Sequence, residues 1–165
     1  MSLRVSAAAD ADVRAIAALR SAVAHDMTHK HGQGPWSAYV GRSTVLRQLR
    51  ATRMLVARRD DEIVGTVRLM QADQTLYDYR AFTPATVALY VIGLAVAPHA
   101  HGQGVGRELM ESAKAAARFW PAEALWLDTY ESAAGAGRFY EKCGFRKVGA
   151  QRLNGSPLTY YEWRA

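Results

Sequence analysis

Cysteine is almost absent from this chain, since only Cys143 among its 165 residues carries a thiol. A single thiol cannot form a disulfide within the chain, and a zinc site built from cysteines is excluded. No apolar stretch approaches the ~20 residues that a membrane-spanning helix needs. Aspartates interrupt the apolar residues near the N-terminus, which is unlike a secretory signal. These absences predict a cytoplasmic protein that does not enter a membrane.

Long blocks of like charge are also missing, although 21 basic and 15 acidic residues give a net charge of +6. The arginines of residues 42–53 are spaced as on the solvated face of a helix. The chain has no nucleic-acid recognition motif, so a role in binding nucleic acid is disfavoured. The basic surplus is compatible with a plain surface or with an anionic small-molecule ligand.

The composition and the apolar pattern predict a single α/β domain over residues 1–165. Asp10 is expected to cap the first helix, and residues 28–37 are expected to form a loop after it. Three further helices are expected at 38–51, 105–120 and 133–145, the last of them stopped by Gly144. Strands are expected at 4–7, on both sides of a turn at 60–62, and at 85–96, 123–130, 146–153 and 158–164.

Three glycines at alternate positions, Gly102, Gly104 and Gly106, separate a predicted strand from the clearest predicted helix. The first turn of a helix has unpaired N–H groups, and the helix dipole adds partial positive charge there. Glycines let an anion approach the main chain and permit a positive φ. The stretch therefore indicates a cradle for a diphosphate, although a tight turn between strand and helix would also use glycines.

Two well-known phosphate loops do not fit these glycines. The P-loop needs Lys followed by Ser or Thr after its last glycine, and no such string occurs. The dinucleotide fingerprint Gly-x-Gly-x-x-Gly fails from either starting glycine, because its last position falls on Arg107 or on Leu109.

Residues 93–113, GLAVAPHAHGQGVGRELMESA, resemble the acyl-CoA-binding segment of the GNAT N-acetyltransferase superfamily. That segment has a Leu-x-Val-x-Pro strand end followed by Arg/Gln-x-x-Gly-x-Gly/Ala. Residues 137–149, GRFYEKCGFRKVG, resemble the C-terminal helix and strand of the same family. The resemblance implies a mixed, mostly antiparallel sheet of about seven strands, splayed between its two central strands and flanked by about four helices.

The resemblance also implies an enzyme that transfers acetyl from acetyl-CoA to a primary amine, by direct attack in a ternary complex. The amine would belong to a small molecule or a peptide. The residues implied in binding coenzyme A are Leu94, Val96, His101, Gly102, Gln103, Gly104, Val105, Gly106 and Arg107. The chain departs from the family pattern at His101, which replaces Arg or Gln, and at Ala133, where relatives often carry Asn. Ser132 is available to supply the contact that Ala133 lacks.

Tyr140 falls on the family tyrosine to which proton donation to the departing thiolate is usually assigned. An ordinary phenol has a pKa near ~10, so Tyr140 carries its proton at neutral pH. The alternative is an aromatic side chain of the core beside Phe139. Of the two, Phe139 is expected to be the core residue.

The general base is left open by the sequence. Tyr90 occupies the position at which histone-acetylating relatives carry a glutamate, so that assignment does not transfer. The candidates near the end of the 123–130 strand and in the first loop are Asp128, Tyr130, Glu131, His25, Asp26, His29 and His31, and a chain of water molecules is a further alternative.

His25 and His29 are spaced one helical turn apart, as metal ligands can be, but no companion acidic motif accompanies them. They are therefore expected to be surface or substrate-loop residues, and no metal is predicted. Cys143 has no histidine beside it in sequence and is expected to be a small buried hydrophobic residue.

The walls of the acceptor pocket are expected from residues 25–37, 77–82 and 154–163. Their aromatic residues and scattered acids disfavour polycationic aminoglycosides and leave small amines, amino acids and peptide N-termini open. Pairing of two chains is common in the family, so a homodimer is possible. The alternative function is a sensor or interaction module that binds acyl-CoA without turnover.

Overall fold

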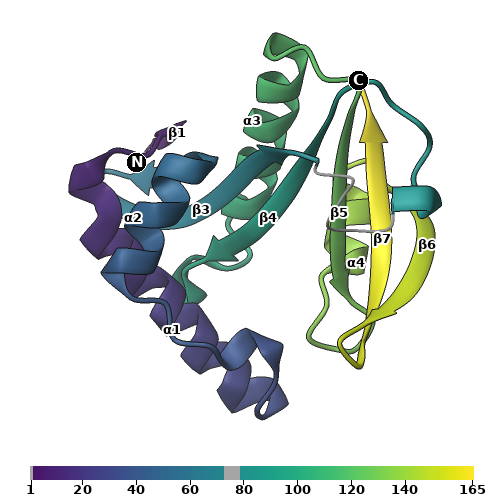
Figure 1. Cartoon of the computed structure of the whole chain (residues 1–165). Helices are drawn as coiled ribbons and strands as arrows, with labels where there is room; N and C mark the ends of the chain where they lie inside the picture. The colour runs from purple at the N-terminus through teal and green to yellow at the C-terminus, as the bar shows by residue number, and fades with distance from the viewer. Residues whose placement is uncertain (1, 73–78) are drawn as a thin grey trace. The chain divides into compact units, whose positions relative to one another are not determined.

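The computed structural model describes residues 2–72 and 79–165. Figure 1 shows the helices and strands of these residues in the predicted order. Their bounds are β1 Leu3–Ala7, α1 Val13–His31, α2 Arg42–Ala51, β2 Arg53–Arg59, β3 Glu62–Gln71, β4 Ala88–Val96, α3 Val105–Phe119, β5 Ala124–Tyr130, α4 Gly137–Lys142, β6 Arg146–Leu153 and β7 Ser156–Arg164.

Within the described residues the strands form a seven-stranded sheet in the order β1-β2-β3-β4-β5-β7-β6. The β4–β5 pair is parallel, whereas β1–β2, β2–β3, β5–β7 and β6–β7 are antiparallel. This confirms the predicted mixed, mostly antiparallel sheet with four helices. The chain divides into two compact units, Met1–Leu69 with Ile92–Ser112 and Met70–Val91 with Ala113–Ala165. The single domain over 1–165 stays a prediction.

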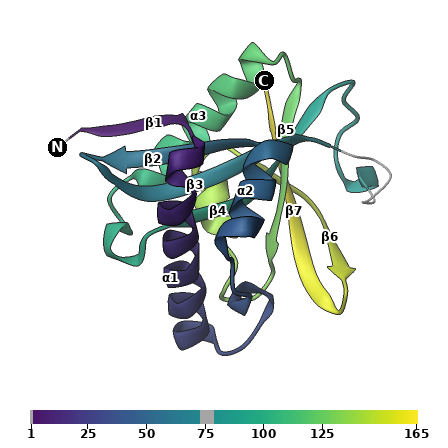
Figure 2. The same ribbon diagram turned by 60° about the vertical axis from the view of Figure 1, so that its left-hand side comes forward.

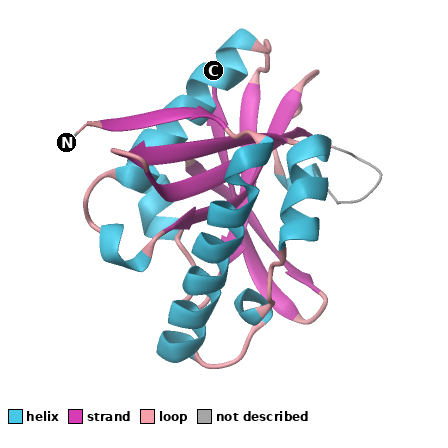
Figure 3. Cartoon of the chain, turned by 90° about the vertical axis from the view of Figure 1, so that its left-hand side faces the viewer, coloured by secondary structure: helices cyan, strands magenta, loops and turns pink. Residues whose placement is uncertain are grey.

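The first unit contains β1, β2, β3 and the second half of β4. Figure 2 shows β1, β2 and β3 side by side, and Figure 3 shows α1 and α2 lying in front of these strands. The start of α3 packs on the strands at Gly65, where a Cβ would lie 2.8 Å from Val105 Cγ1 and 2.9 Å from Leu109 Cδ1. Ile16 of α1 and Val45 of α2 are fully buried. The unit therefore has helices on both faces of its strands, which is how a mixed sheet buries its apolar side chains.

The second unit contains the first half of β4 and the strands β5, β7 and β6. Ala88–Tyr90 of β4 pair with Ala124–Trp126 of β5. The core is aromatic: the Phe82 ring stacks on Trp126 with ring centroids 4.6 Å apart, and it also contacts Tyr90 and Tyr160. Stacked and edge-to-face rings of this kind contribute beyond their buried area.

The predicted first loop begins too early, because α1 continues through residues 28–31. Nothing in this segment breaks a helix before Gly32, which has a φ of 77° and ends α1. The start of this helix also differs from the prediction. Asp10 begins a 3₁₀ turn, and the carboxylate of Asp12 accepts a hydrogen bond of 2.9 Å from Ala9 N.

Two other predicted helices are shorter than expected. α2 begins at Arg42 rather than at residue 38, because Gly41 is extended and precedes the first helical turn. α4 covers only Gly137–Lys142 instead of 133–145. The chain makes a tight turn before it, in which a Cβ on Gly135 would lie 1.7 Å from Tyr130 O. Gly144, with a φ of 88°, follows α4 as predicted.

Candidate active site

The turn between β4 and α3 leaves its main chain open. Gly102 and Gly104 have φ values of 72° and 84°, and no atom lies within 4 Å of the Cβ that each would carry. Backbone conformation, rather than lack of space, therefore explains both glycines. Glu108 N donates to Gly104 O over 3.0 Å, so the N–H groups just before Glu108 belong to the first turn of α3 and have no partner inside the helix. This geometry fits the diphosphate of coenzyme A, which needs several N–H donors at one place.

Side chains of the turn tie it to the end of the neighbouring strands. His101 Nε2 donates to Val96 O over 2.9 Å, which places a proton on Nε2 of this imidazole. Gln103 Nε2 donates to His99 O over 2.9 Å, and Gln103 Oε1 accepts a hydrogen bond from Arg59 of β2. Val105 is buried, whereas Arg107 is exposed. Side-chain hydrogen bonds therefore hold the turn.

The end of β4 presents donors on the edge opposite β3. Ala97 N donates to Val64 O over 2.9 Å. Because successive N–H groups of a strand point in opposite directions, those of Val96 and Leu94 point away from β3. Gly93, with a φ of 66°, precedes this alternating stretch. Both residues are thus oriented to pair with an extended ligand.

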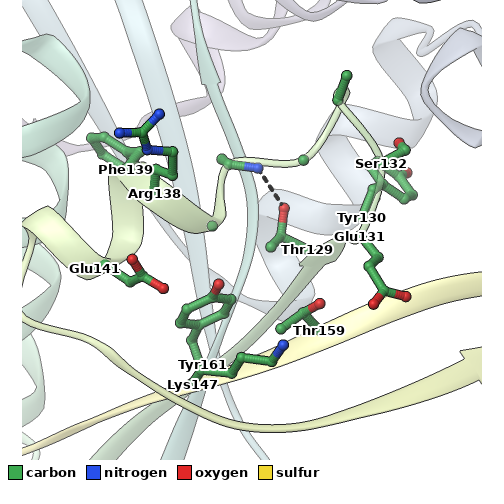
Figure 4. A pocket seen from close by; sticks show the side chains of 14 residues that line it. Thr129, Tyr130, Glu131, Ser132, Arg138, Phe139, Glu141, Lys147, Thr159 and Tyr161 are labelled. Carbon is green, nitrogen blue, oxygen red and sulfur yellow. Dashed lines mark hydrogen bonds between the residues drawn. The ribbon is translucent and has the colours of Figure 1, made fainter.

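The second unit contains an open pocket of about 510 Å³ between the end of β5 and α4 (Figure 4). Ser132 and Ala133 line it, as do residues of β6 and β7. The pocket wall is fixed by a hydrogen bond of 2.8 Å from Ala136 N to Thr129 Oγ1. Tyr161, also in the wall, is hydrogen-bonded to Glu141, and burial followed by the charge of Glu141 raises the pKa of Tyr161. The pocket therefore combines a rigid rim with charged groups.

Tyr140 is the buried residue of α4, with 7% of its surface exposed. Its ring contacts Phe139, Phe145 and Tyr161 at centroid distances of 5.2, 5.9 and 6.3 Å. Burial, followed by the charges of Asp128 and Cys143, raises the pKa of Tyr140 far above its ordinary value. The expectation that Phe139 is the core residue of the pair is wrong: Phe139 is only half-buried and lines the pocket.

Asp128, near the end of β5, lies in the same unit as Tyr140 and accepts a hydrogen bond from Tyr90 Oη. Burial raises the pKa of Asp128, although the Tyr90 hydrogen bond lowers it in part. The charge of Asp128 adds to burial in raising the pKa of Tyr130. Tyr90 of β4 thus contacts a carboxylate on the neighbouring strand β5.

The other candidate bases placed on α1 and after β5 are either exposed or paired with a lysine. His25, His29 and His31 are exposed on α1, as is Glu131 after β5. Asp26 forms a 2.8 Å ion pair with Lys30, whose hydrogen bond lowers the Asp26 pKa, with smaller contributions from His101 and His29.

The remaining predictions concern Cys143, metal ligands, membrane-spanning helices and the acceptor wall. Cys143 is buried and its thiol is free of disulfides, as expected. Within residues 2–72 and 79–165 no three His, Cys, Asp or Glu side chains are grouped as metal ligands would be. No helix there is both long and apolar enough to cross a membrane. Residues 77 and 78 of the expected acceptor wall lie outside the described residues.

Arg68 of β3 has surroundings that the sequence did not indicate. Its Nε atom is buried and has no hydrogen-bond partner among the residues that the structure describes. Burial, with a smaller contribution from the charge of Arg20 on α1, lowers the pKa of Arg68 to about 10. The contact depends on two elements far apart in the chain, so the local sequence around Arg68 gives no signal of it.

Solved structures share this fold. PaiA N-acetyltransferase from Thermoplasma acidophilum, in complex with coenzyme A, has a TM-score of 0.77 at 14% identity and covers 100% of both chains. Ribosomal-protein-alanine N-acetyltransferase from Brucella melitensis has a TM-score of 0.77 at 18% identity, over 98% of this chain and 99% of its own. YncA from Salmonella typhimurium, with its cofactor acetyl-CoA, has a TM-score of 0.73 at 19% identity, over 99% of this chain and 94% of its own.

No curated protein matches the sequence. The acetyltransferase (GNAT) family, in contrast, matches it over residues 17–145, and this range includes both segments on which the resemblance was based except the last four residues of the second. The predicted family and co-substrate are confirmed. The chain belongs to the acetyltransferase (GNAT) family and is an acyltransferase that uses acetyl-CoA as its co-substrate.

Proposed function

We propose that the chain transfers the acetyl group of acetyl-CoA to a primary amine, which attacks the thioester directly in a ternary complex. The turn after β4 carries the proposal, because Gly102 and Gly104 adopt positive φ with open space around them and the N–H groups that start α3 have no partner inside the helix. In the proposed complex the diphosphate sits on the N–H groups of residues 102–107. His101, tied to Val96 O, stabilises the turn without adding a permanent charge.

The pantetheine arm pairs with β4 in the manner of an added strand. The N–H groups of Leu94 and Val96 point away from β3 and are assigned to this pairing and to the thioester carbonyl. As the amine attacks, that carbonyl oxygen gains negative charge, and each well-placed donor can stabilise the transition state by ~3 kcal/mol.

Tyr140 is assigned to protonating the departing thiolate of coenzyme A. Its raised pKa keeps the phenol protonated across the physiological range. A free thiol has a pKa of ~8.5, below that of the phenol, so the thiolate is the weaker base of the two. Tyr140 therefore stabilises the departing thiolate mainly by donating a hydrogen bond, and a proton that it does transfer is replaced by the one released from the amine.

Asp128 is assigned to removing the proton of the amine, directly or through water. An aliphatic ammonium has a pKa near ~10 and must lose a proton before its nitrogen can attack. Burial raises the pKa of Asp128, which makes its carboxylate a stronger base than an ordinary aspartate. The hydrogen bond from Tyr90 orients this carboxylate.

Thiol release from acetyl-CoA, measured over a panel of primary amines, tests the proposal. We expect release with at least one class of amine, and at least a ~100-fold loss of turnover in Asp128→Asn with acetyl-CoA affinity unchanged. Tight binding of acetyl-CoA in calorimetry, with no release for any amine, would support a sensor without turnover. Absence of binding at millimolar acetyl-CoA, on folded protein, would overturn the assignment of the turn.

A further inference from the structure

Among the described residues Arg68 of the first unit has no acidic partner, and the charge of Arg20 acts on it. Arg68 points its guanidinium against β4, and its Nε atom is buried without a partner within the described residues. Arg20, on α1, is close enough for its charge to disfavour the charged form of Arg68. Burial lowers the pKa of Arg20 as well. A buried guanidinium nitrogen without a hydrogen-bond partner costs the folded protein stability.

The contacts of Arg68 place it beside β4. A Cβ on Gly93 would lie 3.3 Å from Arg68 Nε and 3.5 Å from Nη2. Gly93 is exposed, and it directly precedes Leu94, whose N–H is assigned to the acyl arm. Arg20 donates a hydrogen bond to the side-chain carbonyl of Gln48 on α2. Figure 3 shows α1 and α2 over the strands of this unit, so both helices supply groups on this face.

Other arginines show what a purely structural role looks like here. Arg58 forms a 2.7 Å ion pair with Asp12, and Arg146 forms one of 2.7 Å with Glu162. Arg68 forms no ion pair with any acid in the part of the chain that the structure describes. A guanidinium that is held by packing and left unpaired has donors available for a carboxylate or another anion.

We propose that Arg68 binds the carboxylate of the acceptor, which is therefore an amino acid or a close analogue, at Gly93. The inference rests on the proposed acetyl transfer. In an α-amino acid a single carbon separates the amine nitrogen from the carboxyl carbon. A carboxylate held at Gly93 therefore keeps the amine close to Leu94, where the thioester carbonyl is assigned. Two positive charges repel polyamines, and peptides with their carboxylate far from the amine gain nothing from this site.

The test compares acceptors that differ only at the carboxylate. Acetyl-CoA is offered with each L-amino acid, with its amide, and with the amine that lacks the carboxyl group, such as phenylalanine, phenylalaninamide and phenethylamine. We expect kcat/KM to be about 10- to 100-fold higher for the preferred amino acids than for their partners, the size of a charge-assisted interaction.

Three variants assign that preference to the arginine. Arg68→Gln should remove the preference for amino acids while acetyl-CoA affinity stays unchanged, and Arg68→Lys should restore part of that preference. Arg47→Gln, which changes an exposed arginine of α2, is the matched control and should keep it. Arg68→Gln should also unfold at an equal or higher temperature, because it removes an unpaired buried charge. A structural arginine would give the opposite shift.

Each contrary result has a distinct meaning. Equal use of amino acids, amides and amines by the unaltered chain would overturn the carboxylate assignment and leave acetyl transfer standing. If Arg68→Gln lowers kcat/KM by the same factor for all acceptors, Arg68 has a structural role. A preference for succinyl-CoA over acetyl-CoA that Arg68→Gln removes would place the carboxylate on the acyl donor, and the acceptor assignment would be wrong. Failure of acetyl-CoA to bind would instead overturn the proposed function.

Discussion

The two units of the molecule treat buried charge differently. In the second unit Glu162, 2% exposed, accepts hydrogen bonds of 3.0 Å from Thr83 N, 2.6 Å from Thr83 Oγ1 and 2.7 Å from Arg146 Nη2. In the first unit Arg68 has a buried nitrogen with no partner within the described residues. Hydrogen bonds to an ion offset its loss of water, so Glu162 can hold structure. The buried Nε of Arg68 lacks this compensation within the described residues, in keeping with the proposed ligand.

The contrast is not a general property of the first unit. There Arg58 donates to Asp12 over 2.7 Å. Burial raises the pKa of Asp12. The hydrogen bond and the charge of Arg58, together with the Ala9 N–H, lower this pKa by a larger amount, so the net change is downward. The same unit thus pairs one arginine and leaves another unpaired beside Gly93. We therefore use the presence of an ion-pair partner to distinguish charges with a structural role from charges proposed to bind a ligand.

The largest effect is expected from Tyr140→Phe, which tests whether proton chemistry belongs to the second unit. Removing the hydroxyl should lower kcat by about 100-fold or more, because the thiolate loses its acid. Acetyl-CoA affinity, assigned to the first unit, should not change. Thiol release and calorimetry measure the two quantities. Tyr161→Phe removes a neighbouring hydroxyl and serves as the control. Equal losses of kcat and affinity in Tyr140→Phe would indicate a packing role.

Glu162→Ala should have the next largest effect, on stability. The change removes three hydrogen bonds to a buried carboxylate and leaves a cavity, which should lower the free energy of unfolding by about 2 kcal/mol. The partners lower the pKa of Glu162 despite its burial, so its contribution is present above the ordinary glutamate pKa. The deficit should therefore shrink as the pH falls through the lowered pKa. Urea denaturation measures it, with exposed Glu131→Ala as control; equal midpoints would contradict a structural role.

The sequence predicted those features that depend on neighbouring residues. Gly102 and Gly104 were identified because positive φ and access to the main chain are local requirements, and both glycines have the expected φ. The turn at 60–62 likewise follows from the polar residues between two apolar runs, with Asp60 at a φ of 54°. The order of helices and strands follows from apolar periodicity.

The features that the sequence missed depend on packing between distant segments. Which of Phe139 and Tyr140 is buried cannot be inferred from periodicity, because α4 has only 6 residues and makes less than two turns. The contact of Arg68 with Gly93, and the charge of Arg20 near both, join α1, β3 and β4. An arginine in a strand is ordinarily expected at the surface, so its buried nitrogen becomes visible only in the structure.

A smaller effect on affinity is expected from Gly104→Ala. At a φ of 84° an alanine costs roughly 1–2 kcal/mol, although its Cβ would meet no other atom within 4 Å. Gly155→Ala is the matched control, since Gly155 has a φ of 80° and equally open surroundings in the turn between β6 and β7. Both variants should lose similar stability. Only Gly104→Ala should weaken acetyl-CoA binding, by about 10-fold, because it alone distorts the N–H groups of the turn. Equal affinities in calorimetry would exclude the turn from the binding site.

The smallest effect concerns the stability of Asp128→Asn, which extends the comparison to an acid. Burial raises the folded-state pKa of Asp128 above its unfolded value, so the charged carboxylate destabilises the fold. This destabilisation is absent below the pKa of the unfolded state. It grows as the pH rises from that value to the pKa of the folded state, and it is complete above the latter. Asparagine keeps a carbonyl for the Tyr90 hydroxyl and carries no charge, so the variant should be slightly more stable at neutral pH and no more stable in acid. Thermal unfolding across pH measures the difference. A variant less stable at neutral pH would mean that Asp128 holds structure, as Glu162 does, and would remove the reason to treat its charge as kept for catalysis.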